Sequence, residues 1–143
     1  MSADLYGEAI KALAHAAHGA GTLPGADALV RLDNAYCGDR IELALVMDAG
    51  RIGALAHQTR GCLLCRAAAS LVGLRAPGAS MAQVEQAAAA LEALLAGDTL
   101  PAGAWDELAL FGPLRAYPAR HGCVGLPLQA LRQAVRAAPG EAA

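Results

Sequence analysis

Residues 34–48 read NAYCGDRIELALVMD, and this stretch decides how the rest of the chain is interpreted. Its second half alternates apolar and polar residues as a half-buried strand does. A turn, DAG, separates it from RIGALAH at 51–57 and predicts a hairpin, and ALVRL at 28–32 supplies a third strand-forming segment. The cysteine of the quoted stretch, Cys37, therefore falls in the loop between the first and second predicted strands.

Two helices are predicted on either side of these strands, over residues 4–18 and 62–74. Their apolar residues recur at helical spacing, and a glycine-rich segment ends the first of them. The residues that define the two faces are Leu5, Ile10, Leu13, Ala17, Leu63, Ala67, Leu71 and Leu74.

Further helices are predicted in the second half of the chain. One covers residues 80–97, where Ser80 and Gln83 fit a capping box. Shorter helices are predicted over residues 101–111 and 127–137, and the first residue of the last helix is a proline, which is favoured there.

Composition restricts the classes of function. The chain has 143 residues, so we expect one domain over residues 1–143. A net charge of −2 with scattered basic residues gives no electrostatic footprint for nucleic acid. The first residues show neither a signal peptide nor a membrane span, so the cytoplasm is the expected compartment. Thiols stay reduced there, and the four cysteines therefore indicate metal or redox chemistry before disulfides.

Three of the cysteines lie at the edges of predicted elements and beside glycines. Cys37 is in a loop, Cys62 is at a helix N-terminus and Cys123 is just before the last helix. A helix N-terminus favours the thiolate, which binds metals and attacks sulfur. Any one of these residues alone is equally consistent with a small buried hydrophobic side chain. Three together, with flexible backbone beside each, favour one shared site.

Taken together, these residues resemble the NifU-like iron–sulfur cluster assembly scaffolds, a family that includes the IscU and SufU branches. The resemblance extends over almost the whole chain. It rests on three stretches, of which the first is the most specific: NAYCGDRIEL at 34–43, GCLLCRAAASL at 61–71 and CVGLPLQAL at 123–131.

This resemblance implies an α+β fold, in which helices cover one side of a small, mainly antiparallel sheet of three strands. It implies that the ligands of a zinc ion or an iron–sulfur cluster are Cys37, Asp39, Cys62 and Cys123. It also implies that the protein acts as a scaffold or a zinc-dependent sulfur relay. Its partners would be a cysteine desulfurase that supplies sulfur and apo-proteins or cluster carriers that accept the product.

The end of the chain resembles the SufU branch more closely than the IscU branch. A long segment separates the second and third of these cysteines, and Arg120 stands three positions before the last one. We expect its guanidinium to lean toward the thiolates and offset their negative charge. The IscU branch has a histidine directly before that cysteine, whereas Gly122 intervenes here, so His121 is expected to be a solvent-facing loop residue.

The chemistry of these donors agrees with the resemblance. Three thiolates and one carboxylate suit tetrahedral zinc, and the same atoms can hold an iron–sulfur cluster. A carboxylate such as Asp39 binds a soft centre less firmly than a cysteine, so the site can open there. Cys37, in its glycine-flanked loop, is the expected sulfur acceptor, because such an exchange needs an accessible thiolate.

Cys62 and Cys65 form a C-x-x-C motif that leaves two alternatives open. A dithiol oxidoreductase would use both, although such motifs normally follow a strand in a βαβ unit. A structural zinc site in an adaptor protein would use Cys65 in place of Asp39. The remaining histidines, His15, His18 and His57, are expected at surface or boundary positions.

Overall fold

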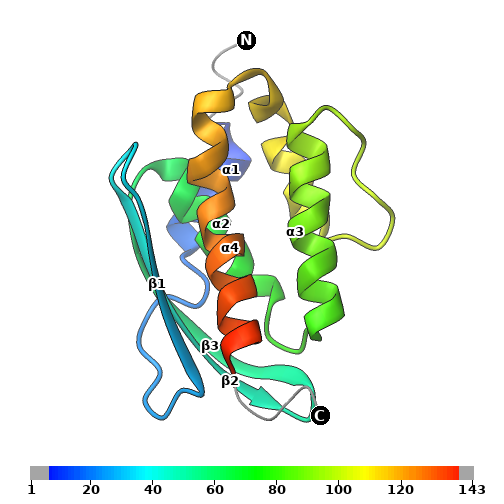
Figure 1. Cartoon of the computed structure of the whole chain (residues 1–143). Helices are drawn as coiled ribbons and strands as arrows, with labels where there is room; N and C mark the ends of the chain where they lie inside the picture. The colour runs from blue at the N-terminus through cyan, green and yellow to red at the C-terminus, as the bar shows by residue number, and fades with distance from the viewer. Residues whose placement is uncertain (1–6, 139–143) are drawn as a thin grey trace.

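The computed structural model describes residues 7–138 and places a three-stranded sheet against a set of helices (Figure 1). The strands are β1 (Ala28–Asn34), β2 (Asp39–Asp48) and β3 (Arg51–Arg60). They pair in chain order, and both pairings are antiparallel. The predicted hairpin and the α+β sheet are therefore confirmed.

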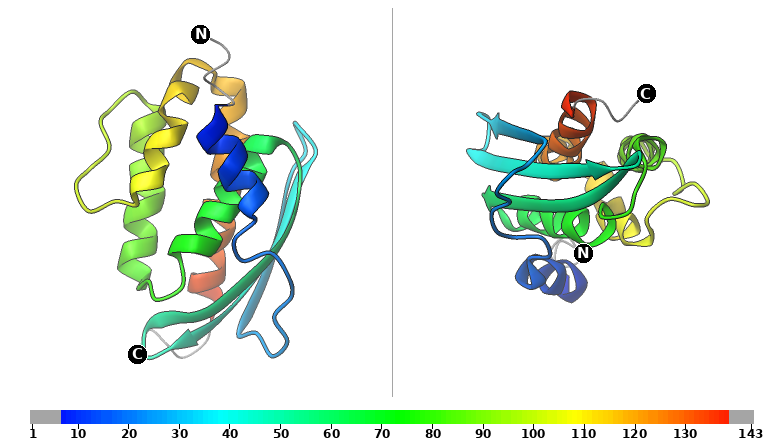
Figure 2. Two further views of the ribbon diagram at one scale, coloured as in Figure 1. Left: turned by 180° about the vertical axis from the view of Figure 1, so that it is seen from behind. Right: turned by 90° about the horizontal axis from the view of Figure 1, so that it is seen from below.

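The helices form layers on one side of this sheet. The helical elements are α1 (Glu8–Ala16), α2 (Leu63–Arg75), α3 (Met81–Leu95), the 3₁₀ segments η2 (Asp106–Ala116) and η3 (Pro118–Arg120), and α4 (His121–Ala137). Both α2 and α4 pack against the strands, α3 and η2 lie beyond them, and α1 packs on α2 (Figure 2). None of the helices within residues 7–138 is long and apolar enough to cross a bilayer.

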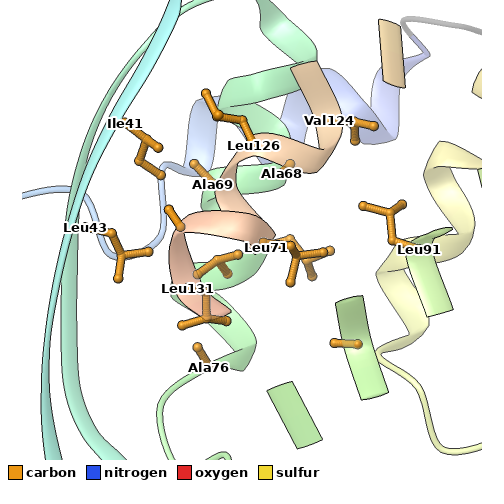
Figure 3. Packing of buried hydrophobic residues seen from close by; sticks show 14 of the residues in the cluster. Ile41, Leu43, Ala68, Ala69, Leu71, Ala76, Leu91, Val124, Leu126 and Leu131 are labelled. Atoms are coloured by element: carbon orange, nitrogen blue, oxygen red, sulfur yellow. The ribbon is translucent and has the colours of Figure 1, made fainter. Parts of the chain in front are cut away.

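Strand β2 and helix α2 supply the centre of the core. Side chains on a strand alternate between faces, and Ile41, Leu43 and Leu45, on one face of β2, have no exposed surface. Ile41 and Leu43 point toward α2 and α4 (Figure 3). The middle of α2 is built from small residues, chiefly alanine, which lets the sheet, α1 and α4 approach it closely.

One predicted helix boundary and part of one predicted buried face are wrong in the first half of the chain. Helix α1 ends at Ala16, because Ala17 takes a left-handed conformation with φ of 47° and is exposed. Leu5 lies outside the described residues. In α2, Leu74 is 42% exposed and Leu63 only half-buried, so the apolar spacing identified the helix but not its whole buried face.

Two further corrections concern the second half of the chain. The helix predicted over 101–111 is wrong: residues 101–105 lie outside any helix, and the 3₁₀ helix η2, which contains Pro113, begins at Asp106. Helix α4 begins at His121 and not at Pro127, which lies inside it. The proline removes one helical hydrogen bond, but Val124 and Leu126 before it are buried in the core and stabilise the extra turns. The predicted capping box is confirmed, since Ser80 and Gln83 exchange their hydrogen bonds.

The connection from α1 to β1 crosses α2 at a single glycine. The backbone N–H of His18 donates to Ser70 Oγ (3.0 Å), and the His18 carbonyl accepts from His57 Nε2 (2.8 Å). His57 is thus buried and not at the surface, and this burial lowers its pKa, so the ring stays neutral. A Cβ on Gly73 would overlap the His18 carbonyl and lie 2.8 Å from the backbone nitrogen of Gly19.

Replacing Gly73 by alanine is therefore expected to destabilise the protein, by about 2 kcal/mol or more, because the crossing chain has to move. Gly125 is the matched control, since it also lies inside a helix but an added Cβ meets no described atom within 4 Å. Gly125→Ala should stabilise the fold by roughly 0.5–1 kcal/mol. Urea unfolding of both variants tests this, and equal midpoints would contradict it.

Candidate metal centre

The candidate metal centre lies where the chain turns from β1 into β2. The carbonyl of Asn34 accepts hydrogen bonds from the backbone N–H groups of Cys37 (3.2 Å) and Gly38 (2.8 Å), and its side-chain Oδ1 accepts from Tyr36 N–H (3.1 Å). Gly38 has a φ of +78°, which favours glycine. The local sequence therefore builds a tight turn that presents Cys37 as an exposed thiol.

Asp39, the first residue of β2, connects this turn to helix α2. Its side chain is buried, and Oδ1 accepts a hydrogen bond from the backbone N–H of Cys62 (2.9 Å), the residue that caps α2. Oδ2 accepts from Cys37 Sγ (3.0 Å) and lies 3.6 Å from Cys62 Sγ. A Cβ on Gly61 would overlap Oδ1 and lie 2.8 Å from Asp39 Cγ, so only glycine fits before Cys62.

The pKa of Asp39 reflects two opposing effects. Burial disfavours the charged form and would raise the pKa. The hydrogen bonds from Cys37 and from the backbone of Cys62 outweigh burial, and the pKa of Asp39 is lowered. The carboxylate is therefore ionised at neutral pH and available as an oxygen ligand.

Helix α4 brings the third residue of the centre. Cys123 is the third residue of α4, not a loop residue before it, and is buried with its Sγ 3.1 Å from Cys37 Sγ. A Cβ on Gly122 would lie 2.8 Å from Asn34 Nδ2, so this glycine lets α4 start directly against the turn. Burial, followed by the hydrogen bonds to Cys37 and Asp39, raises the pKa of Cys123. The turn and the starts of α2 and α4 lie at the same end of the molecule (Figure 1).

The ligand atoms of Cys37, Asp39 and Cys123 all lie within 4.8 Å of one another. In tetrahedral zinc sites, with sulfur at about 2.3 Å from the metal, two sulfur ligands are about 3.8 Å apart. The sulfur atoms of Cys37 and Cys123 would therefore need to move apart only slightly to admit a metal ion, so these residues fit one. Cys62 contacts Asp39 but is not part of this group, and its role as a fourth ligand stays a prediction.

Three other predicted residues lie outside this group. Cys65 has no exposed surface, and burial raises its pKa. His121 is half-buried rather than solvent-facing, because its Nε2 donates to the Leu114 carbonyl (2.7 Å). Arg120 is exposed, and its guanidinium forms no ion pair with any residue of the described segment 7–138. Its predicted approach to the thiolates stays a prediction.

Asn34, Gly61 and Gly122 position the centre in ways that the sequence did not reveal. The two glycines next to cysteines were interpreted as flexible backbone, whereas their function is close packing against Asp39 and Asn34. An asparagine three residues before a cysteine that is followed by glycine is the signal that indicates such a turn.

The chain is similar in sequence to two proteins that are named as scaffolds. The chain is 27% identical over 132 residues to the iron–sulfur cluster assembly scaffold protein IscU of Thermotoga maritima, which covers 92% of this chain and 93% of that protein. It is 29% identical over 120 residues to the protein of the same name from Streptococcus pyogenes, covering 83% of this chain and 75% of that one.

Solved structures agree with these sequence relatives. A NifU-like protein (N-terminal) from Brucella abortus superposes with a TM-score of 0.91 at 26% identity, covering 95% of each chain. A scaffold protein for the SUF system from Fervidobacterium islandicum shares the fold, with a TM-score of 0.87 at 21% identity over 94% of this chain and 99% of that one. The family model described as the NifU-like N-terminal domain matches residues 6–124, and the chain therefore belongs to that family.

Proposed function

We propose that this protein is an iron–sulfur cluster assembly scaffold in which Cys37 accepts sulfur from a cysteine desulfurase. The observation that supports this best is the group of Cys37, Asp39 and Cys123, in which one exposed thiol contacts two buried ligand groups. The curated relatives from Thermotoga maritima and Streptococcus pyogenes are named as such scaffolds. Iron and sulfide are the cargo that these ligands hold.

The position of Cys37 suits sulfur acceptance. Its thiol is exposed on a turn with an adjacent glycine, so a partner's persulfide can reach it. Asp39 Oδ2 accepts a hydrogen bond from this thiol at 3.0 Å, and an ionised carboxylate there can take the proton when the thiol attacks. The acceptor sulfur is then held beside the residues that bind the cargo.

The same residues fit zinc, which would keep the thiolates deprotonated and together when no cluster is present. Cys62 is the proposed fourth ligand, because its Sγ already lies 3.6 Å from Asp39 Oδ2. Apo-proteins or cluster carriers are the proposed acceptors of the product. We place the reaction in the cytoplasm, where thiols stay reduced.

The two alternative functions are less well supported. A dithiol oxidoreductase needs two thiols in contact, one of them accessible, but Cys65 has no exposed surface, and within residues 7–138 Cys62 Sγ contacts Asp39 Oδ2 rather than Cys65. A purely structural zinc site needs no exposed ligand, whereas Cys37 is exposed. Scaffold function explains both the accessible thiol and the buried ligands.

Removal of the Asp39 carboxylate is expected to weaken zinc binding. Loss of a group that only hydrogen-bonds to a metal ligand lowers metal affinity roughly 10-fold to 100-fold. Loss of the ligand itself should lower zinc affinity by at least as much. Asp33→Ala is the control, because Asp33 is an exposed carboxylate on β1 that pairs with Arg40. Competition with a chromophoric chelator measures both variants and the parent protein. Equal zinc affinity in Asp39→Ala and Asp33→Ala would contradict the assignment of Asp39 as a ligand.

Cys37→Ser is expected to abolish sulfur acceptance, whereas Cys65→Ala should keep most of it and retain its metal content. The reason is access, since one thiol is exposed and the other lies in the core. Mass spectrometry after incubation with a desulfurase and cysteine locates the persulfide. A persulfide on Cys65, or loss of metal when Cys65 alone is removed, would refute the proposed assignment.

Arg120→Ala is expected to lower metal affinity and persulfide yield several-fold, because three thiolates and a carboxylate carry an excess of negative charge. Arg115→Ala is the control, as Arg115 is also an exposed arginine and lies in η2. Metal affinity and persulfide yield should change with salt concentration in the parent protein and in Arg115→Ala, but not in Arg120→Ala. If Arg120→Ala leaves both unchanged, Arg120 is simply a solvated surface charge.

A further inference from the structure

Cys37 and Cys123 are in direct contact, and this contact is distinctive among the thiols of the chain. Their sulfur atoms are 3.1 Å apart. All four cysteines lie within residues 7–138, and no other pair of them is in hydrogen-bond contact there. The exposed member is the proposed sulfur acceptor, and the buried member is held at the start of α4.

We propose that Cys123 is the resolving thiol for a persulfide on Cys37. Its sulfur attacks Cys37 Sγ, the bond to the terminal sulfur breaks, and sulfide leaves as a Cys37–Cys123 disulfide forms. This inference rests on the proposed function, because it starts from sulfur accepted by Cys37. It gives Cys123 a chemical step in addition to its proposed role as a ligand.

The step balances without an external reductant. The electron pair of the Cys123 sulfur forms the new S–S bond, and the pair of the old S–S bond leaves with the terminal sulfur. The terminal sulfur is reduced to sulfide, and Cys123 is oxidised to the disulfide. Cys123 loses its proton as its sulfur attacks, and the departing sulfide takes up a proton, so hydrogen sulfide is released. A cellular dithiol is then needed to reduce the disulfide before the next round.

The geometry favours attack on the inner sulfur of the persulfide. Displacement at sulfur requires the attacking and leaving atoms to lie on opposite sides of the atom attacked. Cys123 Sγ approaches Cys37 Sγ from the buried side and Asp39 Oδ2 occupies a second direction at 3.0 Å. Cys37 is the exposed residue of the three, so we infer that the terminal sulfur of its persulfide points toward solvent, away from Cys123.

The backbone allows the two sulfurs to come together. A disulfide needs them at about 2.05 Å, so they must approach by about 1 Å. Cys123 is fixed in a helix, whereas Cys37 lies on a turn next to Gly38, where an added Cβ would meet no described atom within 4 Å. The turn can therefore supply the movement. A metal ion bound by both sulfurs would occupy the Cys123 electron pair, so the step belongs to the metal-free protein.

The test uses metal-free, full-length protein loaded with sulfur in two ways, by inorganic polysulfide and by a desulfurase with cysteine. Excess reagent is removed by gel filtration without reductant. Released sulfide is trapped and quantified, and peptide mass spectrometry under non-reducing conditions locates persulfides and disulfides. Wild type and the control Cys65→Ala should release one sulfide per persulfide and acquire the Cys37–Cys123 disulfide. Cys123→Ser should keep its Cys37 persulfide and release sulfide at about one tenth of the wild-type rate or slower.

The outcomes separate this inference from the proposed function. A Cys37 persulfide that persists in wild type, or one that moves onto Cys123, overturns the resolving role but leaves sulfur acceptance intact. Equal sulfide release from wild type and Cys123→Ser overturns it as well. If neither donor gives a persulfide on Cys37 of Cys123→Ser or a Cys37–Cys123 disulfide in wild type, the proposed function and this inference fail together. If Cys123→Ser does not fold, the wild-type peptide map alone decides, since absence of the disulfide refutes the step.

Discussion

The hydrogen bond from the Cys62 backbone to the buried carboxylate of Asp39 is the interaction on which the centre depends. A buried carboxylate requires hydrogen-bond donors, and here the N-terminus of α2 and the Cys37 thiol provide them. The same contact fixes the start of α2 against the start of β2. Gly61 makes it possible, because any side chain there would displace the carboxylate. The Asp39 carboxylate thus stabilises both the packing of α2 on β2 and the arrangement of the centre.

Close packing of small residues extends this arrangement through the molecule. Glycines stand at the points where backbone meets backbone or a polar side chain, at Gly73 against His18 and at Gly122 against Asn34. The first contact holds the α1–β1 connection on α2, and the second brings α4 to the turn before β2. With almost no aromatic residues, the core depends on such close approach rather than on large side chains.

Much of this was predictable from the sequence, because local patterns determine it. The period-2 alternation of β2, the turn before β3 and the Ser80–Gln83 cap are short-range features, and each was predicted correctly. The start of α4 was not, since a proline inside a helix is tolerated only when buried side chains around it stabilise the extra turns. The contact between Cys37 and Cys123 joins residues 86 positions apart, so no local pattern predicts it; the glycine-flanked cysteines favoured a shared site, and the resemblance to a family named its members.

The C-x-x-C motif shows why spacing alone misleads at a helix end. Residues three apart share a face only when both are helical. Cys62 is the N-cap, with an extended conformation of φ −68° and ψ 167°, so the rule does not apply to it. Its sulfur therefore lies beside Asp39, while Cys65 is inside α2 and fully buried. The two thiols therefore lie in different environments. Cys62 contacts the polar centre through the Asp39 carboxylate, whereas Cys65 is part of the hydrophobic core.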